Sequence, residues 1–168
     1  LNRFGQRDAT LRGVEGEAEA ALVSHLVAGV VGDLVRGTFA DGGAIPFLPA
    51  ARLGGSLRWQ TTRLSVGGDL RHAFAQSRTS QPLCAAAGTL AGIEPGTAGI
   101  PCVDVGTPAY TVVNLSAAYQ FLLRGQLHAL TLRVDNVGDV RYFDAASRVK
   151  GFMANPGRNV SLGYRLTF

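Results

Sequence analysis

Two cysteines and three histidines are the side chains best suited to bind a metal or to form a covalent bond. Cys84 and Cys102 lie in the longest segment without a hydrophobic pattern, where a disulfide, free thiols and a metal pair are the alternatives. A metal pair needs further ligands, and no histidine lies near either cysteine in the sequence. His25, His72 and His128 have no shared ligand spacing, so we expect structural or interfacial roles for them.

Three cations complete the set of candidate site residues. Arg78, Arg148 and Lys150, the only lysine, lie in or beside predicted loops, where they can attract an anionic ligand. The sequence contains no nucleophile elbow, phosphate-binding loop or zinc-protease motif. We therefore expect a binding protein without a resident cofactor, and we do not expect an enzyme.

Composition excludes several classes of protein. The chain has 168 residues, of which 46% are hydrophobic and 17% charged, against about 25% charged in an average soluble domain. With a net charge of only +4, such a chain is not disordered, and two cysteines exclude a disulfide-dense miniprotein. No apolar run approaches the roughly 18 residues of a transmembrane helix. Basic residues are dispersed singly, so nucleic acid is not an expected partner.

Alternation of apolar and polar residues is the strongest pattern in the chain, and it predicts β-strands. In the last segment, apolar side chains occupy every second position from Val160 to Phe168. Six further segments have the same period, so we expect seven strands of about ten residues. The other apolar rows begin at Val14, Leu26, Leu53, Leu64, Val113 and Leu130.

The connections between these segments are alternately short and long. The short ones lie near 21–24, 61–63 and 123–125, and the long ones near 36–51, 76–108 and 138–156. This alternation is typical of an outer-membrane barrel, which has tight periplasmic turns and long external loops. Strands of about 9–11 residues also match a tilted membrane crossing.

Charge separates the two faces of the expected strands. The apolar rows contain no charge, and lipid contact explains this because an Arg or Lys facing lipid costs about 2–4 kcal/mol. Aromatic residues near strand ends fit interfacial girdles (Trp59, Phe74, Tyr110, Phe121 and Phe168). Charges lie on the opposite rows (Glu15, Asp33, Arg58, Asp69, Arg71, Arg133, Asp135 and Arg165). We therefore predict an all-β, antiparallel transmembrane β-barrel segment.

The C-terminal third carries the most specific motifs. The stretch Leu132–Tyr142 contains Asn136 and Asp139, and the stretch Asn155–Phe168 contains Pro-Gly-Arg before a last strand that ends in Phe. This combination resembles the C-terminus of TonB-dependent outer-membrane receptors, although Val137-Gly138 replaces the apolar pair usual in that family. Upstream, Gly13-Val14-Glu15 and the segment from Ile45 to Gly54 resemble further strands of these receptors.

The resemblance implies a larger protein than this chain. Such receptors have an N-terminal plug inside a 22-stranded barrel and a segment that binds TonB. We therefore expect residues 1–168 to be the C-terminal part of the barrel, about its last third, with the plug and earlier strands outside this sequence. The implied partners are outer-membrane lipid, TonB through the missing N-terminal region, and a small metal chelate as cargo, for which we expect an iron–siderophore complex.

The resemblance also assigns roles to the last strand and to the longest loop. Tyr164, Leu166 and Phe168 resemble the signal that the barrel assembly machinery reads, and an extended strand can pair with another sheet edge. With Phe168 in the periplasm, every long connection lies outside the cell. In that oxidising location we expect a Cys84–Cys102 disulfide, which closes a loop of 19 residues.

Other functions remain open on the sequence alone. One alternative is a small, self-contained structural or adhesive outer-membrane barrel, which would need an eighth strand. Another is the zinc-uptake branch of the receptor family, which the segment 46–54 resembles. An outer-membrane enzyme is a third.

Overall fold

Seven antiparallel strands form the whole regular structure of the described chain. The computed structural model describes residues 6–80 and 103–168. The strands are β1 (Ala9–Val23), β2 (Leu26–Phe39), β3 (Arg52–Gln60), β4 (Leu64–Ala73), β5 (Tyr110–Leu123), β6 (Gln126–Asp135) and β7 (Asn159–Thr167). In these residues no helix has the length and apolar character needed to cross a membrane. The all-β prediction and the number of strands are confirmed.

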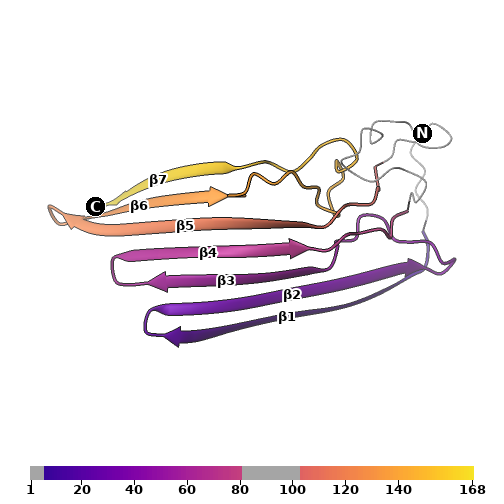
Figure 1. Ribbon diagram of the computed structural model, residues 1–168, viewed down its shortest axis with the longest axis horizontal. Coiled ribbons are helices and arrows are strands. Elements are labelled where there is room, and N and C mark those ends of the chain that lie inside the picture. The colour runs from indigo at the N-terminus through magenta and orange to yellow at the C-terminus, as the bar shows by residue number, and fades with distance from the viewer. Residues whose placement is uncertain (1–5, 81–102) are drawn as a thin grey trace.

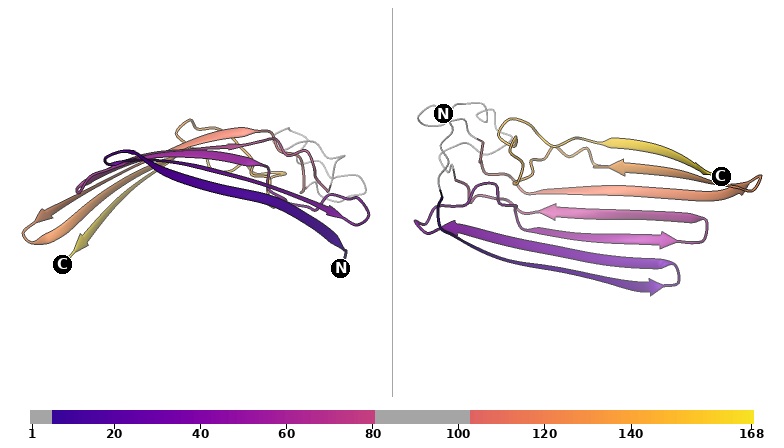
Figure 2. Two further views of the ribbon diagram at one scale, coloured as in Figure 1. Left: turned by 90° about the horizontal axis from the view of Figure 1, so that it is seen from below. Right: turned by 180° about the vertical axis from the view of Figure 1, so that it is seen from behind.

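The strands form one sheet in chain order, so each strand pairs with its sequence neighbours (Figure 1). The sheet is curved along its length, and β1 and β7 are its two edges (Figure 2). Long connections lie at one end of the sheet and tight turns at the other. This arrangement follows the predicted alternation of short and long connections.

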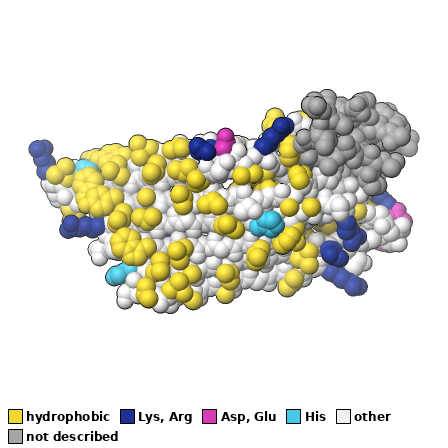
Figure 3. All heavy atoms as spheres, viewed as in Figure 1, with side chains coloured by type: hydrophobic (Ala, Val, Ile, Leu, Met, Phe, Trp, Pro, Cys, Tyr) yellow, Lys and Arg dark blue, Asp and Glu magenta, His cyan; other side chains and the backbone are white. Residues whose placement is uncertain are grey.

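The register brings all predicted apolar rows onto one face. Directly paired residues share a face of a sheet, and Val30 pairs with Gly55, Gly55 with Leu70, and Leu70 with Val113. The same face continues through β6 and β7, where Leu132 pairs with Leu162. Figure 3 shows these hydrophobic side chains spread over the convex face. They pack against no second layer of the described chain, and Leu162 is 78% exposed.

Three strands are longer than the predicted ten residues, because the hydrogen-bonded ladder continues past the apolar rows. β1, β2 and β5 have 15, 14 and 14 residues. At the other end, the turns are short because residues with positive φ reverse the chain quickly. His25 has φ 70°, and Arg124 and Gly125 have φ 52° and 78°.

Buried side chains are concentrated near the loop end of the sheet. Val105 and Phe143, from two different loops, form one small cluster. Ala73, Tyr110 and Val112 form another beside Tyr142. The loops therefore have their own packed core, which the strands alone do not supply.

Candidate functional site

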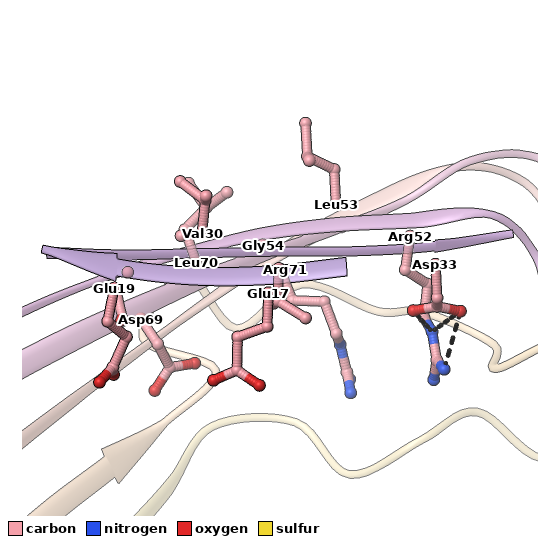
Figure 4. Close-up of a pocket in the computed structure, with 14 residues that line it drawn as sticks. Glu17, Glu19, Val30, Asp33, Arg52, Leu53, Gly54, Asp69, Leu70 and Arg71 are labelled. Carbon is pink, nitrogen blue, oxygen red and sulfur yellow. Dashed lines mark hydrogen bonds and ion pairs between the residues drawn. The ribbon is translucent and has the colours of Figure 1, made fainter. Parts of the chain in front are cut away.

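The concave face of the sheet carries paired charges opposite the apolar face. Asp33 of β2 and Arg52 of β3 are directly paired in the register. The Arg52 Nε atom donates to both Asp33 carboxylate oxygens, at 3.1 and 3.0 Å, and its Nη2 atom donates to Oδ1 at 3.0 Å. Figure 4 shows these side chains on the opposite side of the sheet from Val30, Leu53 and Leu70.

Glycines hollow the sheet beside this ion pair. The hollow, of about 310 Å³, is lined on its polar side by Glu17, Glu19, Asp33, Arg52, Asp69 and Arg71. A Cβ atom added to Gly54 would lie 2.9 Å from Val31 Cγ1, and one added to Gly29 would lie 2.7 Å from Ser56 Oγ. A larger residue at either position would therefore have to displace the neighbouring side chain.

A larger hollow of about 690 Å³ lies between the concave face and the last loop. Arg71, Arg133 and Arg158 line it together with Asp69 and Asp135. Arg133 pairs with Asp135 at 2.7 Å, and the Asn114 amide donates to Asp69 at 2.7 Å. The buried Nε atom of Arg71 has no hydrogen-bond partner within the described chain. This hollow offers guanidinium groups to an anionic ligand.

The C-terminal motif residues close the loop between β6 and β7. Asn136, with φ 50°, accepts from the Val140 amide at 2.9 Å and donates to the Val140 carbonyl at 2.9 Å. The Asp139 Oδ1 atom accepts from the Arg158 amide at 2.8 Å. A Cβ atom on Gly157 would lie only 2.6 Å from that same oxygen. The Asn136 and Asp139 side chains therefore bind backbone groups and hold the two ends of this loop together, an arrangement we call the loop clip. Gly157 lets the two ends approach closely.

Replacing Gly157 by alanine should open this clip. The added methyl group displaces the Asp139 carboxylate from the Arg158 amide, and loss of that hydrogen bond costs about 1 kcal/mol. Hydrogen exchange of the complete protein should show faster exchange at the Arg158 amide. Gly16 serves as the control, because a Cβ atom there meets nothing within 4 Å. Equal protection in wild type and G157A would contradict the clip.

Lys150 and Asp104 form a buried ion pair where three loops meet, which we call the loop junction. Lys150 Nζ donates to Asp104 Oδ1 at 2.8 Å and to the Ala145 carbonyl at 2.6 Å. Asp104 also accepts from the Phe47 amide at 3.2 Å and from the Ser80 amide at 2.7 Å. Lys150 has no exposed surface. The expectation that Lys150 faces an external ligand is therefore corrected: its charge is used inside the protein.

The loop junction should withstand mild acid. Burial raises the pKa of the Asp104 carboxyl, but hydrogen bonds from Lys150, Ser80 and Phe47 outweigh it, so the pKa lies below the usual 3.8. A carboxyl with a lowered pKa stabilises the folded state above its unfolded pKa and loses this contribution as the pH falls through its folded pKa. Pepsin should therefore begin to cleave residues 136–158 only below about pH 3.8. D104N should be cleaved without this pH step.

The two candidate arginines stay at the surface. Arg78 is exposed, and its Nη2 atom donates to Thr38 Oγ1 at 3.1 Å. Arg148 is exposed too, and its guanidinium lies 6.0 Å from the centre of the Phe47 ring. Both lie at the loop end, on different loops. The structure does not bring them together with Lys150 in one site.

The last strand is an edge of the sheet. β7 pairs with β6 alone among the described strands. Tyr164 contacts His128, whose Nδ1 atom is 2.6 Å from the tyrosine oxygen, and the Phe168 side chain is 94% exposed. Tyr164, Leu166 and Phe168 thus remain a predicted assembly signal on an accessible edge. Cys84 and Cys102 lie outside the described residues.

The histidines have separate surroundings. His72 Nδ1 lies 2.8 Å from Thr111 Oγ1, while His25 is in the turn between β1 and β2. The described part of the chain contains no group of three or more His, Cys, Asp or Glu side chains arranged to hold a metal. Sequence reasoning missed the grouping of Arg71, Arg133 and Arg158. The sequence placed Arg71 and Arg133 on the polar face of their strands, but Arg158 joins them only because the loop between β6 and β7 folds back.

A curved antiparallel sheet with an apolar convex face, a charged concave face and no second layer defines a wall segment of a membrane β-barrel. The model of the family described as "TonB dependent receptor-like, beta-barrel" matches residues 2–137, and the chain belongs to this family. This family consists of outer-membrane transport receptors rather than enzymes. The match ends at β6, and β7 joins the same sheet through its pairing with that strand.

Two solved membrane-protein structures share this fold. One is the copper transporter OprC, with 21% identity and a TM-score of 0.71, for which the match covers 94% of this chain and 23% of that chain. The other is BauA, the ferric preacinetobactin receptor from Acinetobacter baumannii, with 12% identity, a TM-score of 0.69, and coverage of 94% and 22%. This chain thus spans less than a quarter of their lengths. No curated protein matched.

Proposed function

We propose that this chain is part of an outer-membrane receptor that imports a scarce metal as a small chelate, with energy supplied through TonB. The observation that carries the proposal is the charged concave face, which suits a water-filled lumen, in a chain of this receptor family. In this role the segment supplies barrel wall, external loops and, through β7, the assembly signal. The plug and the TonB-binding segment belong to the remainder of the receptor.

Anionic cargo fits the cations at the loop end. Arg148 is exposed on the last loop, and Arg71, Arg133 and Arg158 line the hollow between that loop and the concave face. Carboxylate and phenolate groups of an iron–siderophore complex would be attracted by such a path of guanidinium groups. The names of the two structural neighbours, a copper transporter and a ferric chelate receptor, support a metal cargo of this general kind.

The test is metal uptake by the complete receptor. Cells that lack other receptors for the same cargoes should accumulate one labelled cargo from a panel of ferric siderophores, copper and zinc, and accumulation should require TonB. The double variant Arg71→Gln, Arg158→Gln should bind an anionic ferric chelate at least about tenfold more weakly, since each charge-assisted hydrogen bond contributes about 1.5–3 kcal/mol. Arg63→Gln, in a turn at the far end of the sheet, should bind normally.

Several outcomes would contradict the proposal. Accumulation that persists without TonB would exclude active transport through this receptor. Failure to take up any metal cargo, with correct insertion in the membrane, would favour a structural or adhesive barrel. Uptake of zinc alone would assign the receptor to the zinc branch and contradict the iron–siderophore assignment.

A further inference from the structure

Two arginines face each other on the convex side of the sheet, at its loop end. Arg12 of β1 and Arg36 of β2 are direct partners in the register. They occupy the position next beyond Val14 and Leu34 on the same face, because alternate residues of a strand share a face. The apolar face therefore ends in a pair of positive charges, and Figure 3 shows dark-blue side chains gathered at this end of β1 and β2.

This pairing is unfavourable unless an anion lies nearby. Like charges directly opposite each other destabilise a sheet, and both Arg12 and Arg36 are exposed. In the described chain, four other arginines have a carboxylate partner (Arg7, Arg52, Arg58 and Arg133). Within residues 6–80 and 103–168, no carboxylate lies within 4.0 Å of Arg12 or Arg36.

A third arginine and a hollow complete the arrangement. Arg78 reaches Thr38, which follows Arg36 on the convex face, and donates to its hydroxyl at 3.1 Å. Arg36 and Arg78 both line a hollow of about 240 Å³ at the end of β2. Its other walls include Leu34, Ile45, Leu48 and Phe74. The hollow thus combines apolar side chains with two guanidinium groups. An amphiphile could place its apolar part against the former and an anionic head group against the latter.

We propose that the outer arginine cluster, Arg12, Arg36 and Arg78, binds the phosphate of a membrane lipid headgroup. Guanidinium groups match phosphate oxygens in pairs, and a phosphate between Arg12 and Arg36 would relieve their repulsion. The cluster borders the apolar face, so a lipid whose chains lie on that face places its phosphate at this level. Continuity with the apolar face and the apolar walls of the hollow favour a lipid over a free anion. The inference rests on the membrane placement of the proposed function.

The experiment measures lipid binding by the purified complete receptor in detergent. The probe is bisphosphorylated lipid A, with dephosphorylated lipid A and inorganic phosphate as the other two arms. Wild type should bind lipid A at least about tenfold more tightly than the dephosphorylated form, as loss of one or two charge-assisted hydrogen bonds requires. The double variant Arg12→Gln, Arg36→Gln should bind lipid A as weakly as wild type binds the dephosphorylated form.

A matched control removes the same charge elsewhere. Arg63→Gln, Arg124→Gln lies in turns at the opposite end of the sheet and should bind lipid A like wild type. Heat-modifiable migration verifies that both variants are folded. Equal loss in both double variants, unchanged binding in R12Q/R36Q, or full competition by millimolar phosphate would each overturn the lipid assignment. Cargo uptake is measured separately, so uptake with no phosphate-dependent lipid binding would overturn only this inference.

Discussion

Arginine in place of Ala117 is expected to destabilise the receptor by about 2–4 kcal/mol, whereas arginine in place of its neighbour Ala118 should cost close to nothing. The two alanines are adjacent in the middle of β5 and equally half-buried, but they lie on opposite faces. Ala117 pairs with Leu132 and Val66 on the convex face, while Ala118 pairs with Thr131 and Ser65 on the concave face. One added charge would face hydrocarbon, and the other would face water.

Urea unfolding of the complete receptor in lipid vesicles measures the difference directly. Both alanines line a hollow of about 400 Å³, so an arginine has room at either position. The matched pair cancels the effects of side-chain size and strand propensity, because the same substitution is made in the same strand. Equal stability of A117R and A118R would show that the convex face does not contact lipid. This result would contradict the proposed placement of the sheet in the membrane.

Methionine in place of Lys150 should open the loop junction. Removing one partner of a buried ion pair costs about 3–5 kcal/mol, because the other charge stays buried without compensation. Lys150 is 0% and Asp104 3% exposed at the side chain, so solvent screens the pair little. Hydrogen exchange should become faster at the Ser80 and Phe47 amides, which donate to Asp104, and at residues 136–158. The strands should keep their protection.

Arg148→Met provides the control for this prediction. Arg148 is two positions from Lys150 and carries the same charge, but it is exposed, so its removal should change stability by no more than about 0.5 kcal/mol. The double variant K150M/D104N should recover part of the loss, since no uncompensated charge remains. If K150M and R148M exchange alike, the ion pair does not hold the loops together.

Strand faces were predictable because a period of two assigns each side chain without knowledge of the fold. Once Leu130, Leu132 and Val134 share a face, their partners Tyr164, Leu162 and Val160 must share it too, and the register confirms this. The turns were predictable for a similar reason: only a few residues separate the apolar rows. The alternating pattern does not predict where a strand ends, so the continuation of β2 from Arg36 to Phe39 was missed.

Loop contacts were not predictable, because they join residues far apart in the chain. Lys150 resembles any solvent-exposed loop lysine until Asp104, 46 positions away, is placed beside it. The C-terminal motif was recognised, but its physical role depends on the hydrogen bond between Asp139 and the Arg158 amide, 19 positions apart. Arg71 and Arg158 meet for the same reason. Local pattern defines the barrel wall, and tertiary folding of the loops defines the candidate site.

The meeting of three loops at one ion pair also limits how the receptor can be engineered. Phe47, Ser80 with Asp104, and Lys150 belong to three separate connections, yet they share one carboxylate. Exchange of only the connection with Asp104, or only the one with Lys150, for that of a related receptor would leave the other charge buried without its partner. Chimeras with altered cargo preference should therefore be built by transplanting all three connections as one unit, and natural drift in one of them should be matched by drift in the others.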